Sequence, residues 1–259
     1  MNIPESQRET GGVSVKVGGL RKSFEGQEVL RGVDFEVAPG EIFVIMGPSG
    51  SGKSVLLKHI IGLEKPDGGD ILIDGQPVGN GELLAKYRLA MVFQSGALLN
   101  SLTVAENVGL YLSEHRLQRP AEIARIVGEK LAVVGLQGQG EKLPGDLSGG
   151  MKKRAAIARA LVIEPQLILY DEPTSELDPL SAISVAGEIL NLQRRTGVTS
   201  IIVSHDRELA FGVAERIAVL NEGRVLAVGR PEEIRANPDP LIQQFLNTDF
   251  KTALSKRDS

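Results

Sequence analysis

Residues 47–54 read Gly47-Pro48-Ser49-Gly50-Ser51-Gly52-Lys53-Ser54, between an apolar run at 42–46 and a segment at 55–61 that can open a helix. The stretch matches the phosphate-binding pattern GxxxxGK[ST]. In a strand–loop–helix context, the backbone N–H groups of a glycine-rich turn converge on phosphates, and the helix N-terminus adds its positive end. Lys53 is expected to reach the outer phosphates, and the Ser54 hydroxyl to bind Mg²⁺. The stretch therefore predicts a P-loop nucleotide-binding protein rather than an ordinary glycine-rich surface turn.

A second motif, Leu147-Ser148-Gly149-Gly150-Met151, narrows this prediction. Ser148 can cap a helix, and Gly149 and Gly150 allow backbone N–H groups to approach a γ-phosphate closely. With the phosphate loop upstream, the motif resembles the LSGGQ signature of ABC transporter ATPases, and the resemblance covers about Val13 to Leu246. It implies ATP and Mg²⁺ as substrate and cofactor. It also implies a head-to-tail dimer, in which Ser148, Gly149 and Gly150 complete the ATP site of the second copy.

Size and composition agree with one large α/β domain or two small ones. The chain has 259 residues, a net charge of −4 and no cysteine. The charge argues against a general nucleic-acid binder, which shows a basic face, and the absence of cysteine is compatible with a reducing cytosol. No apolar stretch approaches the ~20 residues that span a bilayer, and the polar residues 1–12 lack a signal-peptide core. If the protein serves a membrane, it does so by docking to a separate subunit. The resemblance implies a cytoplasmic protein that is peripheral on the inner (plasma) membrane of a bacterium.

The resemblance implies an α/β P-loop NTPase core of ABC ATPase type, with an N-terminal antiparallel β-subdomain and a helical subdomain inserted at about 95–162. The expected limits are a flexible N-terminus at 1–12, a single ABC ATPase domain at 13–246 and a C-terminal tail at 247–259. Residues 13–37 predict two or three strands with a turn near 25–27, and residues 103–138 have helical periodicity. Further strands are predicted at 42–46, 70–73, 89–93, 167–170, 201–203 and 217–220, with short helices beyond Arg230.

Two adjacent acids, Asp171 and Glu172, end the apolar run at 167–170. At the carboxyl end of a buried strand their carboxylates lie beside the phosphate loop. Asp171 is expected to hold Mg²⁺, mainly through its water shell, and Glu172 to be the general base for the attacking water. Two acids before Pro173 are also a common helix-start signal. The phosphate loop favours the catalytic interpretation, because bound Mg²⁺ and ATP give both charges a role.

The resemblance adds two further catalytic candidates. His205 matches the switch histidine of the family, which hydrogen-bonds the γ-phosphate and orients the water and Glu172. Gln94 matches the loop glutamine, which contacts Mg²⁺ or the water and reports the nucleotide state to the helical subdomain. A Ser-His-Asp hydrolase triad at 204–206 is rejected, because adjacent residues cannot adopt that geometry.

Two more positions are expected at the nucleotide by resemblance. Phe24 is the candidate for the aromatic residue that stacks on adenine, although a place in the strand core is a competing interpretation. Asp178 lies in the loop 175–178, which crosses between two cassettes. Glu176 departs from the small residue common there, so the resemblance in the segment that couples the two sites does not extend to this position.

Two short stretches resemble the ATPase of Mla-type (maintenance of lipid asymmetry) phospholipid transport systems. They are Met151 with the following 152–156, and residues 91–104. The resemblance implies a membrane permease, docked near Gln94 to Leu102, and a possible substrate-binding lipid-carrier subunit. The basic run 152–154 itself indicates a solvated helix face more than a contact with anionic lipid.

Two alternatives stay open at this stage. One is the ATPase of a small-solute importer or of an exporter. The other is a soluble ABC protein without transport, such as an iron–sulfur assembly ATPase. The cargo does not contact this subunit in the family, so its sequence does not identify the transported compound.

Overall fold

The computed structural model describes residues 11–79, 83 and 86–247. The expected flexible N-terminus and C-terminal tail therefore lie almost entirely outside the described residues. Two sheets are present. The first has the order β2-β1-β4-β5 and is antiparallel: β1 (Val15–Phe24), β2 (Gln27–Val37), β4 (Gly68–Ile73) and β5 (Gln76–Pro77). The turn at 25–26 joins β1 to β2, as the sequence predicts.

The second sheet has the order β10-β9-β3-β8-β7-β6. Its strands are β3 (Ile42–Met46), β6 (Leu89–Val92), β7 (Leu167–Asp171), β8 (Thr199–Ser204), β9 (Arg216–Asn221) and β10 (Arg224–Gly229). All neighbours pair in parallel except β9 and β10. The parallel strands match the predicted ones, whereas β10 was not predicted. Its apolar run at 225–228 is only partly buried, whereas β7 and β8 are buried along their whole length.

Two hydrophobic cores cover the two faces of the parallel sheet. Phe43 and Ile45 of β3 pack toward the antiparallel sheet and α1 (Lys53–Ile60), while Ile42, Val44 and Met46 pack toward the other helices. This alternation follows from the two-residue period of a strand. Because both faces are covered, the strand is buried along its whole length.

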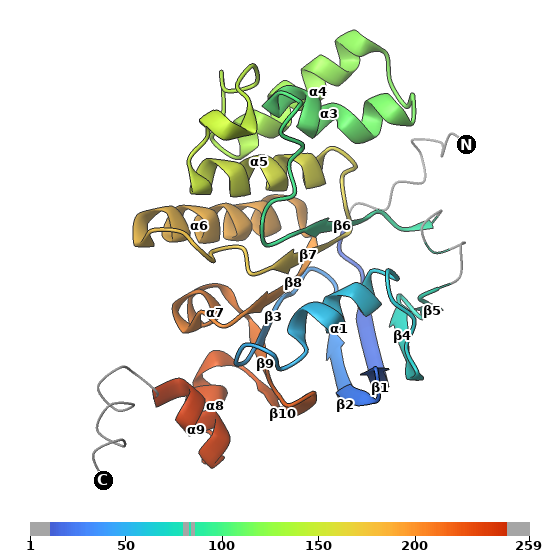
Figure 1. The fold of residues 1–259 in the computed structure, drawn as a ribbon, viewed down its shortest axis with the longest axis vertical. Coiled ribbons are helices and arrows are strands. Elements are labelled where there is room, and N and C mark those ends of the chain that lie inside the picture. The colour runs from blue at the N-terminus through green and yellow to red at the C-terminus, as the bar shows by residue number, and fades with distance from the viewer. Residues whose placement is uncertain (1–10, 80–82, 84–85, 248–259) are drawn as a thin grey trace.

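The other labelled α-helices of the described residues lie on the opposite side of the parallel sheet from α1 (Figure 1). Between β6 and β7 the chain forms α3 (Val104–Glu114), α4 (Pro120–Val133) and α5 (Gly149–Leu161), which gather at one end of the molecule. The remaining four are α6 (Pro179–Thr196), α7 (Arg207–Val213), α8 (Pro231–Ala236) and α9 (Pro240–Asn247). The predicted helical stretch 103–138 is thus divided, with non-helical residues at 115–119.

The strand order brings four loops into one row. The loops leave the carboxyl ends of β3, β8, β7 and β6, which are consecutive in the sheet. They carry the phosphate loop, His205, Glu172 and Gln94, respectively. Ligands bind at this edge of open α/β sheets, so the row marks the candidate site.

Candidate functional site

The phosphate loop joins β3 to α1 without a side-chain cap. Gly52 occupies the N-cap position with a φ of 102°, and Gly50 has a φ of 81°. Both values lie in the left-handed region that favours glycine. At Gly47 the constraint is space, because an added Cβ would lie 2.0 Å from the carbonyl oxygen of Leu220 on β9. The loop is therefore fixed by the close approach of two backbones.

Lys53 is buried at the centre of this loop. Its Nζ donates to the backbone carbonyls of Gly47 at 2.9 Å and Pro48 at 3.1 Å, and it lies 3.7 Å from Oε1 of Glu172. Burial lowers the pKa of Lys53, and the nearby Glu172 carboxylate opposes that change. In the same loop, the Ser51 hydroxyl is buried without a hydrogen-bond partner among the described residues. A cation held by neutral carbonyls beside an unpaired donor suits a polyphosphate anion.

Ser54 and Asp171 meet across the edge of the sheet. The Ser54 hydroxyl donates to Oδ1 of Asp171 at 2.8 Å. Burial is the main cause that raises the pKa of Asp171, and the Ser54 hydrogen bond opposes it. The two oxygens suit Mg²⁺, which prefers hard oxygen ligands and takes few from the protein when phosphates supply the rest. No group of three or more acidic, histidine or cysteine side chains that could hold a metal ion occurs in the part of the chain that the structure describes.

Glu172 points away from Asp171, toward the end of β8. Its Oε2 accepts hydrogen bonds from the Ser204 hydroxyl at 3.1 Å and from the backbone N–H of His205 at 3.3 Å. The imidazole Nδ1 of His205 lies 3.0 Å from the same oxygen, and the Nδ1–H tautomer donates to it. Glu172 is buried, whereas the His205 side chain is 55% exposed. The structure thus joins a buried carboxylate to an accessible imidazole, as a general base and an orienting group require.

Gln94 lies after β6 with an exposed side chain, and its backbone carbonyl is bound by Lys153. Phe24 is 39% exposed at the end of β1, with the Lys22 ammonium 5.2 Å from its ring centroid. That exposure removes the competing interpretation of Phe24 as a strand-core residue. Neither side chain contacts the phosphate loop in the interactions found among the described residues.

The signature residues open α5. Ser148 caps this helix by accepting from the Met151 N–H at 3.3 Å. A Cβ at Gly149 would lie 3.1 Å from Leu177, and one at Gly150 would lie 3.1 Å from Ser181. The two glycines are therefore also needed for packing against the start of α6, a requirement within the chain that the sequence does not reveal.

Asp178 caps α6. Its Oδ1 accepts from the Ser181 N–H at 3.0 Å. Its Oδ2 accepts from the Ser181 hydroxyl at 2.5 Å. The bond from the hydroxyl, and then that from the N–H, lower the pKa of Asp178. The loop before it contains Glu176 with a φ of 65°, so the residue that departs from the family pattern also adopts the left-handed conformation.

The burial of Lys153 was not predicted from the sequence. The basic run 152–154 predicts a solvated helix face, and this is wrong for Lys153, which is 6% exposed. The signal that could have revealed it is helical spacing, because Lys153 lies four residues before the buried Ile157 on the same face of α5.

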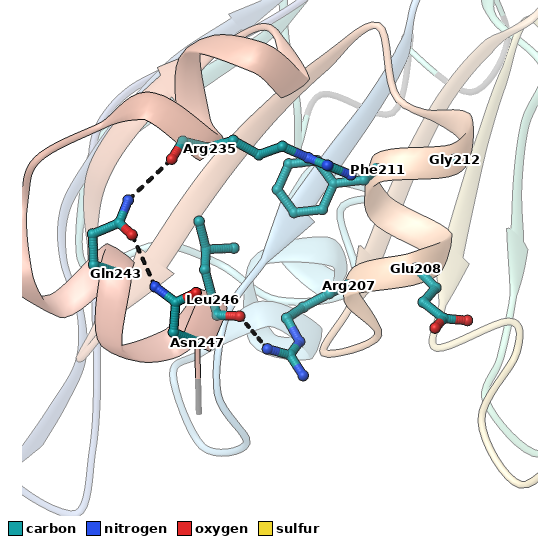
Figure 2. A pocket seen from close by; sticks show the side chains of 8 residues that line it. All are labelled: Arg207, Glu208, Phe211, Gly212, Arg235, Gln243, Leu246 and Asn247. Atoms are coloured by element: carbon teal, nitrogen blue, oxygen red, sulfur yellow. Dashed lines mark hydrogen bonds between the residues drawn. The ribbon is translucent and has the colours of Figure 1, made fainter. Parts of the chain in front are cut away.

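A second concave site lies near His205, between α7 and α9 (Figure 2). Its volume is about 580 Å³. The Arg235 guanidinium lies over the Phe211 ring at 4.4 Å, and Arg207 donates to the backbone carbonyl of Leu246. Arg207 also lines the pocket of Glu172 and His205, so the two concavities are adjacent.

Comparison with protein families matches residues 30–175, more than half of the chain, to the family described as "ABC transporter". The chain belongs to the ABC transporter family. It is an ATP-binding subunit of that family and hydrolyses ATP. The predicted family, fold class and enzyme activity are thereby confirmed.

Two proteins similar to this ABC ATPase have different names. The probable ribonucleotide transport ATP-binding protein mkl of Mycobacterium tuberculosis is 40% identical over 240 residues, which are 91% of this chain and 67% of that protein. Protein TRIGALACTOSYLDIACYLGLYCEROL 3, chloroplastic, of Arabidopsis thaliana is 36% identical over 253 residues, covering 90% of this chain and 73% of that protein.

A solved structure shares the fold of this ABC ATPase. It is the dimeric, post-hydrolysis state of the ATP-binding cassette MJ0796 bound to ADP and Pi. The TM-score is 0.76 at 33% identity, and the alignment covers 84% of this chain and 98% of that chain. Within the described residues of the ABC ATPase studied here, no helix is both long and apolar enough to cross a bilayer.

Proposed function

We propose that this ABC ATPase powers a separate membrane permease by ATP-driven dimerisation and hydrolysis, with phospholipid between bacterial membranes as the cargo. The hydrogen bonds that join Glu172 to Ser204 and His205 carry the catalytic part of this proposal. The permease and the lipid rest on the resemblance at 91–104 and Met151. We further propose a cytoplasmic position, peripheral on the inner membrane, and a lipid-carrier subunit as an accessory partner.

In this mechanism Glu172 accepts a proton from the water that attacks the γ-phosphorus, while the bond from that phosphorus to the β,γ-bridging oxygen breaks and ADP leaves. His205, held by Glu172 through Nδ1, presents its other ring nitrogen toward the substrate and fixes the carboxylate. Lys53 exchanges the Gly47 and Pro48 carbonyls for phosphate oxygens, so that its positive charge neutralises part of the negative charge of the triphosphate. Ser54, Asp171 and Gln94 are the proposed Mg²⁺ ligands, and the ion would neutralise charge on the phosphates.

The dimer follows from the position of the signature residues. Ser148, Gly149 and Gly150 lie at the N-terminus of α5, where free backbone N–H groups and the helix dipole favour an anion. We propose that they bind the ATP held by residues 47–54 of the second copy, with Asp178 and its loop between the two sites and Phe24 on the adenine. The dimeric state of the similar cassette MJ0796 supports this arrangement.

The proposed permease-binding surface is the loop that follows Gln94. Leu99 is 48% exposed, and Leu98 packs partly against the core; Phe93, directly before Gln94, is 37% exposed. Buried Asn107 holds this loop, because its side chain binds the Leu99 N–H and carbonyl at 2.7 and 3.0 Å. A fixed loop with exposed apolar side chains suits a helix of a partner protein.

A second candidate is the import of a small polar solute. The relative mkl favours it, because its name refers to ribonucleotide transport. The name of the Arabidopsis relative contains that of a diacylglycerol lipid, which favours the lipid cargo.

Glu172→Gln tests the proposal. Loss of the general base is expected to lower kcat about 10²–10⁴-fold while ATP binding persists, so the variant should form an ATP-dependent dimer on size-exclusion chromatography. Glu232→Gln, an exposed carboxylate on α8, is the control and should behave as wild type. Near-wild-type turnover of Glu172→Gln would remove Glu172 from its assigned role.

The same variant, tagged and purified with ATP from solubilised membranes, identifies the cargo. A permease with bound phospholipid supports lipid transport, and a permease with a polar-solute-binding protein supports the second candidate. Recovery of soluble partners alone would overturn the assignment to transport.

A further inference from the structure

The ammonium group of Lys153 lies where three segments of the active site meet. Its Nζ donates to the backbone carbonyl of Gln94, to the backbone carbonyl of Glu172 at 3.1 Å and to the Ser175 hydroxyl at 3.3 Å. These acceptors belong to the loop after β6, the end of β7 and the loop before α6. A single side chain of α5 therefore joins three loops that are separate in the sequence.

Every donor of this ammonium is used. A lysine carries three N–H donors and no acceptor, and three acceptors surround Nζ. Lysine is almost never buried without such partners, because taking the charge out of water is costly. Here the residue is 6% exposed and its three partners are neutral oxygens. The cost of burial is therefore offset by hydrogen bonds to backbone and hydroxyl groups whose positions matter for the site.

The backbone of Glu172 needs such support. Its φ is 49°, in the left-handed region that a non-glycine residue keeps only when its surroundings hold it there. The Glu172 carbonyl accepts from Lys153 and also from the N–H and the hydroxyl of Ser175 at 3.2 and 2.9 Å. Its N–H donates to the Val203 carbonyl at 3.0 Å. These bonds fix the peptide groups on both sides of the side chain that reaches Ser204 and His205.

The same helix holds the loop after Gln94 at a second point. The Arg159 guanidinium, on α5, donates to the backbone carbonyls of Ala97 and Gly96 at 2.5 and 2.8 Å. Lys153 and Arg159 together attach both ends of the segment 94–97 to α5. The helix that begins with the signature residues is thus bound to the glutamine loop as well as to the catalytic carboxylate's backbone.

We propose that Lys153 is a positioning residue for ATP hydrolysis, which holds the backbones of Glu172 and Gln94 at fixed places relative to α5. This inference rests on the proposed role of Glu172 as the general base. Because Ser148 caps the same helix, movement of α5 when its N-terminus binds the ATP of a second copy is transmitted through Lys153 to Glu172 of its own chain.

The test replaces Lys153 by methionine, which keeps the length and apolar stem of the side chain but has no donor. We expect kcat to fall about 10- to 100-fold, as for loss of a hydrogen bond from a charged donor, with the Kd for a non-hydrolysable ATP analogue changed less than about twofold. The control is Lys152→Met, the neighbouring lysine, which is only partly buried and should keep wild-type kcat. Lys153→Gln retains two N–H donors without the charge, and it should recover part of the lost rate.

Each outcome decides the matter. Equal kcat values for Lys153→Met and Lys152→Met would overturn the positioning role, and so would a parallel loss of ATP affinity and folding in Lys153→Met and Lys153→Gln. If Lys153→Met does not fold, the kcat and Kd of Lys153→Gln decide by the same criterion. Wild-type turnover of Glu172→Gln would overturn the general-base assignment together with this inference, whereas a failure at Lys153 alone leaves that assignment intact.

Discussion

Replacement of Gly47 by alanine places a methyl group where two backbones already meet. The Cβ would lie 2.0 Å from the Leu220 carbonyl oxygen and 3.1 Å from both the carbonyl carbon and the Ser51 hydroxyl. Carbon–oxygen contacts in proteins occur at about 3.3–3.6 Å, so the loop and β9 must separate by about 1.3 Å or more. Strand β9 resists this movement, because it is hydrogen-bonded to β3 on one side and to β10 on the other.

Two quantities follow from this displacement. Overpacking of this kind costs about 1–3 kcal/mol of unfolding free energy, which corresponds to roughly 2–12 °C in Tm for a chain of this size. Movement of the phosphate loop by about 1 Å is expected to lower kcat on the order of 10²-fold. Thermal unfolding followed by calorimetry and steady-state ATP hydrolysis measure the two effects on the same samples.

Gly187→Ala is the matched control for Gly47→Ala. Gly187 lies within α6, and an added Cβ there meets no atom within 4 Å. The substitution should therefore raise stability by about 0.5–1 kcal/mol and leave kcat unchanged. Wild-type Tm and kcat in Gly47→Ala would show that the loop and β9 separate freely, and would refute the packing argument.

Three further predictions follow from individual hydrogen bonds. Ser54→Ala removes the 2.8 Å hydrogen bond to Asp171. We expect the Mg²⁺ concentration for half-maximal ATPase activity to rise, while nucleotide binding without Mg²⁺ stays unchanged. An unaltered Mg²⁺ titration would argue against Ser54 as a Mg²⁺ ligand. Asn107→Leu leaves the backbone groups within 99–103 that the Asn107 amide binds without their hydrogen-bond partner. The free energy of unfolding in urea should fall by about 2–4 kcal/mol. A wild-type urea midpoint would contradict this role of Asn107. The pKa of Asp178 lies below its ordinary 3.8, so the stabilisation from the ionised carboxylate is present above pH 3.8 and is lost as the pH falls through the lower folded pKa. Asp178→Asn should therefore abolish the contribution of this group to the decrease of the urea midpoint at acid pH. The same decrease in the wild type and the variant would exclude this contribution of Asp178.

The sequence correctly predicts where the phosphate loop and Asp171 lie in the fold. Residues 47–54 lie between β3 and α1, and Asp171 ends β7, because glycine punctuation and apolar runs determine these elements locally. The parallel strands were also predicted, since burial on both faces leaves continuous apolar runs.

What the sequence did not reveal depends on contacts between distant segments. Burial of Lys153 is set by the loops after β6 and β7, and its immediate neighbours Lys152 and Arg154 give no sign of it. The left-handed backbone of Glu172 depends on hydrogen bonds from Ser175 and Lys153 rather than on local preference. Strand β10 has an apolar run at 225–228, but it pairs antiparallel with β9 at the edge of the sheet and is only partly buried.

The row of loops at the carboxyl edge has a consequence for how such a protein can change during evolution. Neighbouring strands lie about 4.8 Å apart, so hydrogen bonds between β3, β8, β7 and β6 fix the lateral spacing of the four loops over about 14 Å. The long segment between β6 and β7 starts at Gln94 and returns to Gln166 at the amino end of β7, opposite the carboxyl edge. Helices α3 and α4 can therefore lengthen, shorten or change their outer surface without moving the reacting groups. A new partner can be acquired in that segment while the strands preserve the geometry of ATP hydrolysis.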